Sequence, residues 1–162
     1  MIKTMIEVQN IHFAYDKTEV LHNVSFTIQE GEFLSLVGAN GSGKSTMMKL
    51  MLGLLPVQMG KITVEGQPLQ YGKSGTRCGY VPQGGMLNVA HFPMTVKEMI
   101  LLKKPGHSVF SFYNAKAKQA VKRALKQVGL ETKENMLLSE LSGGQLQRAL
   151  IARELMLKPK IL

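Results

Sequence analysis

The stretch GANGSGKST, residues 38–46, decides how the rest of this chain is interpreted. It fits the pattern G-x-x-x-x-G-K-[ST] in full. It follows the apolar run FLSLV at residues 33–37, which predicts a strand buried on both faces. A helix is predicted over residues 46–55, ending before Pro56. Because strand, glycine-rich loop and helix in this order are the required context, we interpret residues 38–46 as a loop that binds nucleotide phosphates.

The residue types of this loop suit an anion. Glycines let the backbone approach a phosphate closely, because no Cβ intrudes, and successive N–H groups then point inward. The start of the following helix adds a favourable term of roughly 0.3–2 kcal/mol. Lys44 is predicted to reach the β and γ phosphates, and Ser45 to offer its hydroxyl to Mg²⁺. The predicted nucleotide-binding residues of the loop are Gly38, Asn40, Gly41, Ser42, Gly43, Lys44, Ser45 and Thr46.

A second glycine turn, LSGGQ at residues 141–145, opens the last predicted helix. Ser142, Gly143 and Gly144 would present unpaired N–H groups and a hydroxyl, which makes a second anion site. The simpler interpretation is a helix N-cap, with Ser142 capping and the glycines turning. Two phosphate-binding helix starts in one domain suggest a nucleotide held between two surfaces.

Length and composition indicate a soluble globular domain. The 162 residues suffice for one domain with a sizeable core, and 44% of them are hydrophobic. No apolar run approaches the ~20 residues of a membrane span, and the N-terminus lacks the long apolar core of a signal peptide. Cys78 is the single cysteine, which fits a reducing compartment. We therefore expect a cytoplasmic protein.

The formal net charge of +9 has three interpretations: nucleic acid binding, an anionic membrane surface, or the truncation of a longer protein. The basic residues are scattered, and no aromatic-rich stacking surface accompanies them. No nucleic acid partner is expected.

Strands come first along the chain and helices later, which predicts a mixed α/β domain. Strands are predicted at residues 5–15, 24–29, 61–66 and 78–82. Helices are predicted at residues 94–102 and 114–130, and a last one after Gly144. The apolar stripe of the second helix comprises Ala117, Ala120, Val121, Ala124, Leu125 and Val128.

Four motifs in order resemble the ATP-binding cassette (ABC) ATPases, and the resemblance covers the whole chain. LSGGQ matches the signature motif of this family, and residues 38–46 match its P-loop. Tyr15, which alone would be a packing aromatic, sits where the family stacks a ring on adenine, with Val20 supporting it. Gln83 in GYVPQ matches the Q-loop.

The resemblance implies one nucleotide-binding domain over residues 1–162, with a P-loop NTPase fold of ABC type. Its mixed sheet would include an antiparallel β subdomain, and a helical signature subdomain would span about residues 84–150. The implied cofactors are ATP and Mg²⁺. Lys44 and Gln83 would be catalytic, and Ser45 and Gln83 would contact Mg²⁺. The residues implied to bind ATP in trans, on the P-loop of a second subunit in a head-to-tail dimer, are Ser142, Gly143, Gly144 and Gln145.

The resemblance also implies that the chain is the N-terminal part of a longer subunit. In the family, the strand beginning at KPKIL continues to an Asp that holds Mg²⁺ and a Glu that polarises the attacking water. A later His contacts the γ-phosphate. Here no acidic residue follows Glu154, and no His follows the signature. We expect efficient hydrolysis from the complete subunit but not from these 162 residues alone.

The segment after Gln83 indicates what the ATPase drives. VPQ followed by FPMTVKEMI resembles the zinc and manganese uptake branch of bacterial ABC transporters. The implied partners are a transmembrane permease subunit, contacted through this segment at the inner face of the membrane, and indirectly a substrate-binding protein. His91 is a lone loop histidine without a second ligand at metal-binding spacing. The alternatives are a soluble ABC protein acting on ribosomes or DNA, and a non-catalytic nucleotide-binding fragment.

Overall fold

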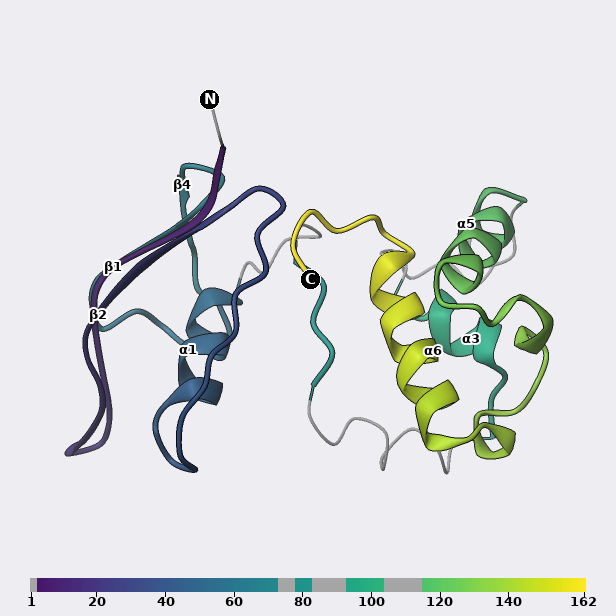
Figure 1. Ribbon diagram of the computed structural model, residues 1–162, viewed down its shortest axis with the longest axis horizontal. Coiled ribbons are helices and arrows are strands. Elements are labelled where there is room, and N and C mark those ends of the chain that lie inside the picture. Colours follow the sequence, from purple (N-terminus) through teal and green to yellow (C-terminus); the bar gives the residue numbers. More distant parts are fainter. Residues whose placement is uncertain (1–2, 73–77, 83–92, 104–114) are drawn as a thin grey trace. The chain divides into compact units, whose positions relative to one another are not determined.

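The computed structural model describes residues 3–72, 78–82, 93–103 and 115–162 (Figure 1). The chain divides into two compact units, Met1–Gly75 and Thr76–Leu162. Among the described residues, the first unit holds the strands and helix α1, and the second is helical. The predicted combination of an antiparallel sheet with a helical part is therefore confirmed.

The sheet of the first unit has four antiparallel strands in the order β2-β1-β3-β4. Its strands are β1 (Thr4–Tyr15), β2 (Thr18–Gln29), β3 (Met59–Val64) and β4 (Gln67–Pro68). Alternating apolar residues on β1 face the core, as the period-two pattern predicts. The strand predicted at residues 24–29 begins six residues earlier, at Thr18, and forms a long hairpin with β1.

Helix α1 (Lys44–Met51) follows the glycine-rich loop and buries Met47, Leu50 and Met51. It ends four residues before the predicted boundary at residue 55. Gly53 adopts a left-handed backbone with φ 67°, and its N–H donates to the carbonyl of Leu50 while the N–H of Leu54 donates to that of Lys49. These two bonds make a Schellman motif, which closes the helix before Pro56 can do so.

The prediction of a doubly buried strand at residues 33–37 is wrong for this structure. The run has no regular secondary structure, and Phe33 and Val37 are 93% and 89% exposed. A strand buried on both faces needs a hydrogen-bonded neighbour at its edge and a packed layer over each face. Among the described residues, no strand pairs with this run, so Phe33, Leu34 and Val37 stay exposed.

In the described part of the second unit, three helices pack around one apolar core. They are α3 (Val96–Leu101), α5 (Ala115–Gln127) and α6 (Gly143–Leu155), with single 3₁₀ turns at Glu131–Lys133 and Leu138–Glu140. The predicted stripe of α5 is confirmed, with Ala117, Val121, Ala124 and Leu125 buried and Ala120 and Val128 partly buried. No helix in the described part of the chain is long and apolar enough to cross a bilayer.

Thr95 starts α3 through a capping box with Glu98. The Thr95 hydroxyl and backbone N–H both donate to the Glu98 carboxylate, at 2.6 and 2.7 Å. The hydroxyl bond is the main cause that lowers the pKa of Glu98, and the backbone bond adds to it. A carboxylate in the first turn also suits the helix dipole, so α3 begins at a defined residue although it is short.

A buried carboxylate joins the end of α6 to the segment at residues 78–82. Glu154 is 1% exposed, and its Oε2 accepts from the backbone N–H of Tyr80 at 3.1 Å and from Lys103 Nζ at 2.7 Å. Its Oε1 accepts from Arg153 Nε at 3.0 Å. The predicted strand at residues 78–82 is reduced to one parallel bridge between Cys78 and Ile161. Glu154 thus provides much of the polar anchoring of this segment.

We expect Glu154→Ala to destabilise the second unit by about 2–3 kcal/mol, because it leaves the Tyr80 N–H without its acceptor and two cations without a counter-charge. Glu154→Gln keeps an oxygen acceptor and should cost less. Urea unfolding followed by circular dichroism measures both. Glu131→Gln changes an exposed carboxylate of the same unit and is the matched control. Equal stability of Glu154→Ala and this control would contradict the anchoring role.

Candidate functional site

The glycine-rich loop is held against β2 by a contact that requires glycine. Gly43 is the N-cap of α1 and has a left-handed backbone with φ 86°. A Cβ at this position would lie 2.7 Å from Leu21 Cδ2 and 3.0 Å from the Val20 carbonyl oxygen. Any larger residue would therefore push the loop away from the hairpin, besides straining its own backbone.

Lys44 places its positive charge inside this loop. Its Nζ donates to the carbonyl oxygens of Gly38 at 2.8 Å and Ala39 at 2.7 Å, and lies 3.4 Å from Ser42 Oγ. No side chain caps the start of α1, and the first N–H groups of a helix have no intrahelical acceptor. The ammonium group and these N–H groups together form a site that can bind an anion.

The structure brings the predicted loop residues together on one turn. Gly43 and Thr46 are buried and Lys44 is half-buried, whereas Ser45 is exposed in the first turn of α1. The other predicted residues, all exposed, are Gly38, Asn40, Gly41 and Ser42. An exposed hydroxyl beside a loop that can bind an anion is of the oxygen type that Mg²⁺ prefers as a ligand.

Tyr15 and Val20 flank the turn of the β1–β2 hairpin. Tyr15 is 44% exposed, and its ring packs edge-to-face on Phe13 at a centroid distance of 4.9 Å. Val20 reaches the loop directly, since its carbonyl borders Gly43. A half-exposed aromatic ring supported by a second ring offers a surface on which a nucleobase can stack.

The signature turn forms a capping box. Ser142 Oγ accepts from the Gln145 N–H at 3.3 Å, and Gln145 Oε1 accepts from the Ser142 N–H at 3.0 Å. The N-cap interpretation is therefore confirmed. A Cβ on Gly143 or Gly144 would meet no atom within 4 Å, so packing among the described residues does not require either glycine. Gln83 and His91 lie outside the described residues.

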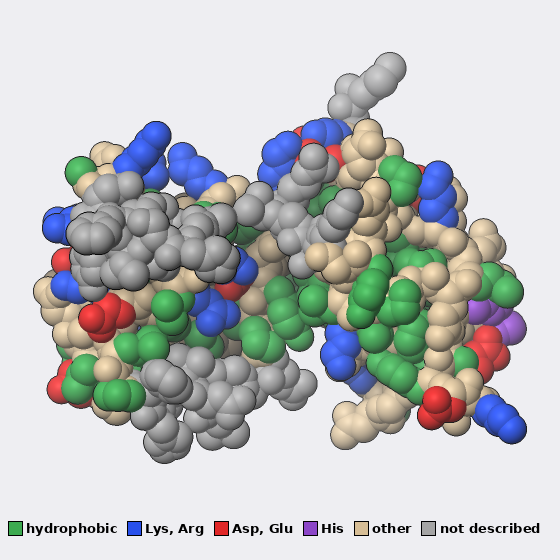
Figure 2. All heavy atoms as spheres, turned by 180° about the vertical axis from the view of Figure 1, so that it is seen from behind, with side chains coloured by type: hydrophobic (Ala, Val, Ile, Leu, Met, Phe, Trp, Pro, Cys, Tyr) green, Lys and Arg blue, Asp and Glu red, His purple; other side chains and the backbone are tan. Residues whose placement is uncertain are grey.

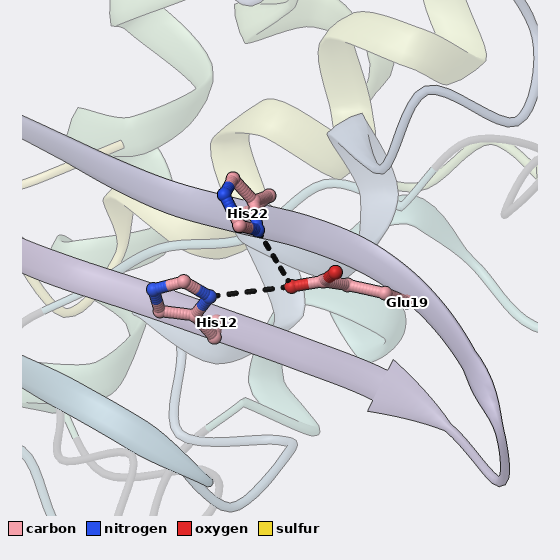
Figure 3. A group of neighbouring side chains, drawn as sticks. All are labelled: His12, Glu19 and His22. Carbon is pink, nitrogen blue, oxygen red and sulfur yellow. Dashed lines mark hydrogen bonds and ion pairs between the residues drawn. The ribbon is translucent and has the colours of Figure 1, made fainter.

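Sequence reasoning missed a cluster of two histidines and a glutamate on the β1–β2 hairpin (Figure 3). The nearest oxygen of Glu19, Oε1, lies 3.2 Å from His12 Nδ1 and 3.0 Å from His22 Nδ1. The hydrogen bond from His22, and next that from His12, lower the pKa of Glu19. In the space-filling view, histidine side chains lie beside an acidic one at the surface (Figure 2).

The pairing register explains why the sequence pattern did not reveal this cluster. Residues three apart on a regular strand, such as Glu19 and His22, point to opposite faces. Phe13 pairs with Leu21 but Ala14 pairs with Glu19, so β2 has one extra residue at this point. This bulge turns Glu19 and His22 to the same side, and no sequence signal marks it.

Comparison with known proteins identifies the family. Residues 21–162 match the ABC transporter family. The chain is 42% identical over 164 residues to the zinc uptake system ATP-binding protein ZurA of Listeria monocytogenes, covering 99% of this chain and 63% of that protein. It is 38% identical over 151 residues to the manganese transport system ATP-binding protein MntB of the same species, covering 93% of this chain and 62% of that protein.

A solved structure supports the same assignment at the level of the fold. The structure of cbiO1 from Clostridium perfringens, described as part of the ABC transporter complex cbiONQ, superposes with a TM-score of 0.82 at 25% identity. The match covers 97% of this chain and 63% of that one. The predicted fold class, a P-loop NTPase of ABC type, is confirmed by this superposition and by the family match, and the chain belongs to the ABC transporter family.

Proposed function

We propose that this chain belongs to the ATP-binding and ATP-hydrolysing subunit of an ABC transporter that takes up zinc or manganese ions. The observation that carries the nucleotide part is the P-loop, with Lys44 held at its centre and the start of α1 uncapped. The relatives named for zinc and manganese systems support the substrate class. Their length exceeds that of this chain, so transport is proposed for the whole subunit.

ATP is proposed to bind across the first unit. Tyr15 would stack on the adenine ring and Val20 would support it, while the loop residues surround the phosphates. In this structure the Lys44 ammonium group donates hydrogen bonds to two loop carbonyls. Phosphate oxygens are stronger acceptors for an ammonium group, so Lys44 would donate to them instead when ATP binds. Ser45, together with Gln83, would hold Mg²⁺, which neutralises phosphate charge when bound.

The signature turn is proposed to act on the ATP of a second subunit. Glycine forms helix less readily than alanine, by roughly 0.5–1 kcal/mol in a helix interior, so two successive glycines at the start of α6 call for an explanation. Because no neighbour in the described part of the chain explains Gly143 and Gly144, an approaching partner supplies the reason. Phosphate oxygens could then reach the N–H groups of this turn, in a head-to-tail dimer with Ser142 and Gln145 at its edge.

The other proposed partners follow from the segment after Gln83. It would contact a transmembrane permease subunit, and through the permease a substrate-binding protein. The ATPase subunit would then lie on the cytoplasmic side, peripheral to the membrane. A single nucleotide-binding domain over residues 1–162, with its helical subdomain at about residues 84–150, is the organisation that we propose for this chain.

Lys44→Ala should abolish ATP binding and ATP turnover in the complete subunit, because Lys44 carries the only charged side chain of the loop sequence at residues 38–46. Fluorescent-nucleotide titration and phosphate release measure the two effects. Lys49→Ala removes an exposed lysine of the same helix and is the matched control. Near-normal turnover of Lys44→Ala would refute the P-loop assignment.

Ser142→Arg should leave ATP binding by the monomer intact and prevent ATP-dependent dimerisation, because its bulk and charge lie at the turn that meets the partner's nucleotide. Sedimentation velocity with a non-hydrolysable ATP analogue measures the dimer. Ser142→Thr keeps the capping hydroxyl, and Ser139→Arg places the same bulk three residues away; both should dimerise. Dimers of Ser142→Arg as abundant as wild type would contradict the trans role.

Loss of the subunit should lower zinc or manganese uptake by the cells that make it, since the proposed ATPase powers import. Uptake of radioactive zinc and manganese by a deletion strain tests this directly. The wild-type gene should restore uptake of one metal, and the Lys44→Ala gene should not. Unchanged uptake of both metals in the deletion strain would reject the substrate class.

A further inference from the structure

We propose that His12, Glu19 and His22 form a binding site for Zn²⁺, or for a divalent transition metal of similar chemistry, on the β1–β2 hairpin (Figure 3). This site is distinct from the P-loop and from the proposed Mg²⁺ ligands. One ligand atom from each of the three side chains lies within 4.8 Å of the others. Both imidazole rings turn the same atom, Nδ1, toward the same carboxylate oxygen.

The distances suit tetrahedral coordination. Zinc bonds to nitrogen and oxygen are about 2.0–2.2 Å long, so two ligand atoms on one tetrahedral zinc ion lie roughly 3.3 Å apart. The separations from Glu19 Oε1 to the two Nδ1 atoms are 3.2 and 3.0 Å. Only the two histidine nitrogens would have to approach one another, and the His22 side chain is 77% exposed and has room to move.

The types of ligand atom in the cluster indicate which metal ions it would bind. Two imidazole nitrogens and one carboxylate oxygen suit zinc and late transition metals, whereas Mg²⁺ and Ca²⁺ take oxygen ligands. Three protein ligands leave the fourth position of zinc for water, and the exposure of Glu19 and His22 gives water access to it. Neutral imidazole is the form that binds a metal ion.

The charges around the site also favour a cation. Among the described residues, the ion-pair and hydrogen-bond partners of the Glu19 side chain are His12 and His22. Neither Lys nor Arg of the described part of the chain pairs with it, so a metal ion would provide the positive charge that the carboxylate attracts. The strands hold the ligands in place, since His12 lies within β1 and the bulge of β2 turns Glu19 and His22 together.

The competing explanation is a carboxylate that accepts hydrogen bonds from two imidazole N–H groups, without any metal. Isothermal titration of ZnCl₂ into the metal-stripped full chain, at neutral pH and without nucleotide, separates the two. The site predicts one saturable Zn²⁺ per chain. His12→Ala, His22→Ala and Glu19→Gln should each weaken that binding roughly tenfold or more. MgCl₂ should produce no saturable binding in this assay.

Three control variants sharpen the titration. Glu7→Gln changes a carboxylate on β1, the strand of His12, and Glu131→Gln changes an exposed carboxylate of the second unit; neither should alter Zn²⁺ binding. Lys44→Ala should also keep it, which makes the result independent of the proposed nucleotide function. No saturable Zn²⁺ binding, or binding that survives all three ligand variants, would overturn the site.

A ligand exchange tests coordination directly. Cysteine is a zinc ligand, so His22→Cys should keep metal binding where His22→Ala loses it. With Co²⁺ as a spectroscopic probe, His22→Cys should add a sulfur-to-cobalt charge-transfer band in the near ultraviolet that the wild type lacks at this site. Absence of this band in a variant whose circular dichroism is native would also refute the proposal.

Discussion

The close approach of Gly43 to β2 is the constraint on which the first unit depends. The missing side chain lets the loop lie against Leu21 and Val20, and the same residue caps α1 with a left-handed backbone. Helix α1 therefore starts with free N–H groups at a fixed distance from the hairpin that carries Tyr15. Lys44 occupies the loop through hydrogen bonds to two backbone carbonyls, so its charge is positioned before any ligand arrives. Close packing and a left-handed backbone at Gly43, and the charge of Lys44 beside it, therefore act at the same place in the loop.

The second unit has an apolar core and, at the start of α6, two glycines that its own packing does not require. Its apolar core holds helices α3, α5 and α6 together, and Glu154 links the end of α6 to the segment near Tyr80 through buried polar contacts. At the opposite end of α6, Ser142 and Gln145 cap the helix, while two glycines remain open to solvent. The same turn thus caps α6 and leaves its two glycines accessible to an anion.

The β1–β2 hairpin carries two kinds of chemistry side by side. Tyr15 and Val20, at its turn, belong to the proposed adenine site. His12, Glu19 and His22 lie together on the same hairpin because the bulge between Leu21 and Glu19 changes the alternation of β2. Without the extra residue between Leu21 and Glu19, Glu19 and His22 would lie three positions apart on a regular strand and point to opposite faces. A local irregularity of the backbone therefore creates a cluster of metal-binding type.

The sequence by itself determined the features that depend on interactions between residues close together in the chain. The glycine pattern of residues 38–46, the apolar stripe of α5, the capping residue Ser142 and the mixed α/β class all depend on neighbours a few residues away. The structure confirms the stripe, the cap and the class, and it shows the loop geometry that the glycine pattern requires.

Tertiary structure alone decided the features that depend on distant partners. Residues 33–37 have the composition of a buried strand but lack a pairing partner among the described residues, and strand formation needs one. Burial of Glu154 depends on Lys103 and Tyr80, which lie far away in the sequence. The histidine–glutamate cluster depends on register, which is a property of two strands together. None of these features can be predicted from the sequence alone, because each depends on which distant residue the fold places in contact with it.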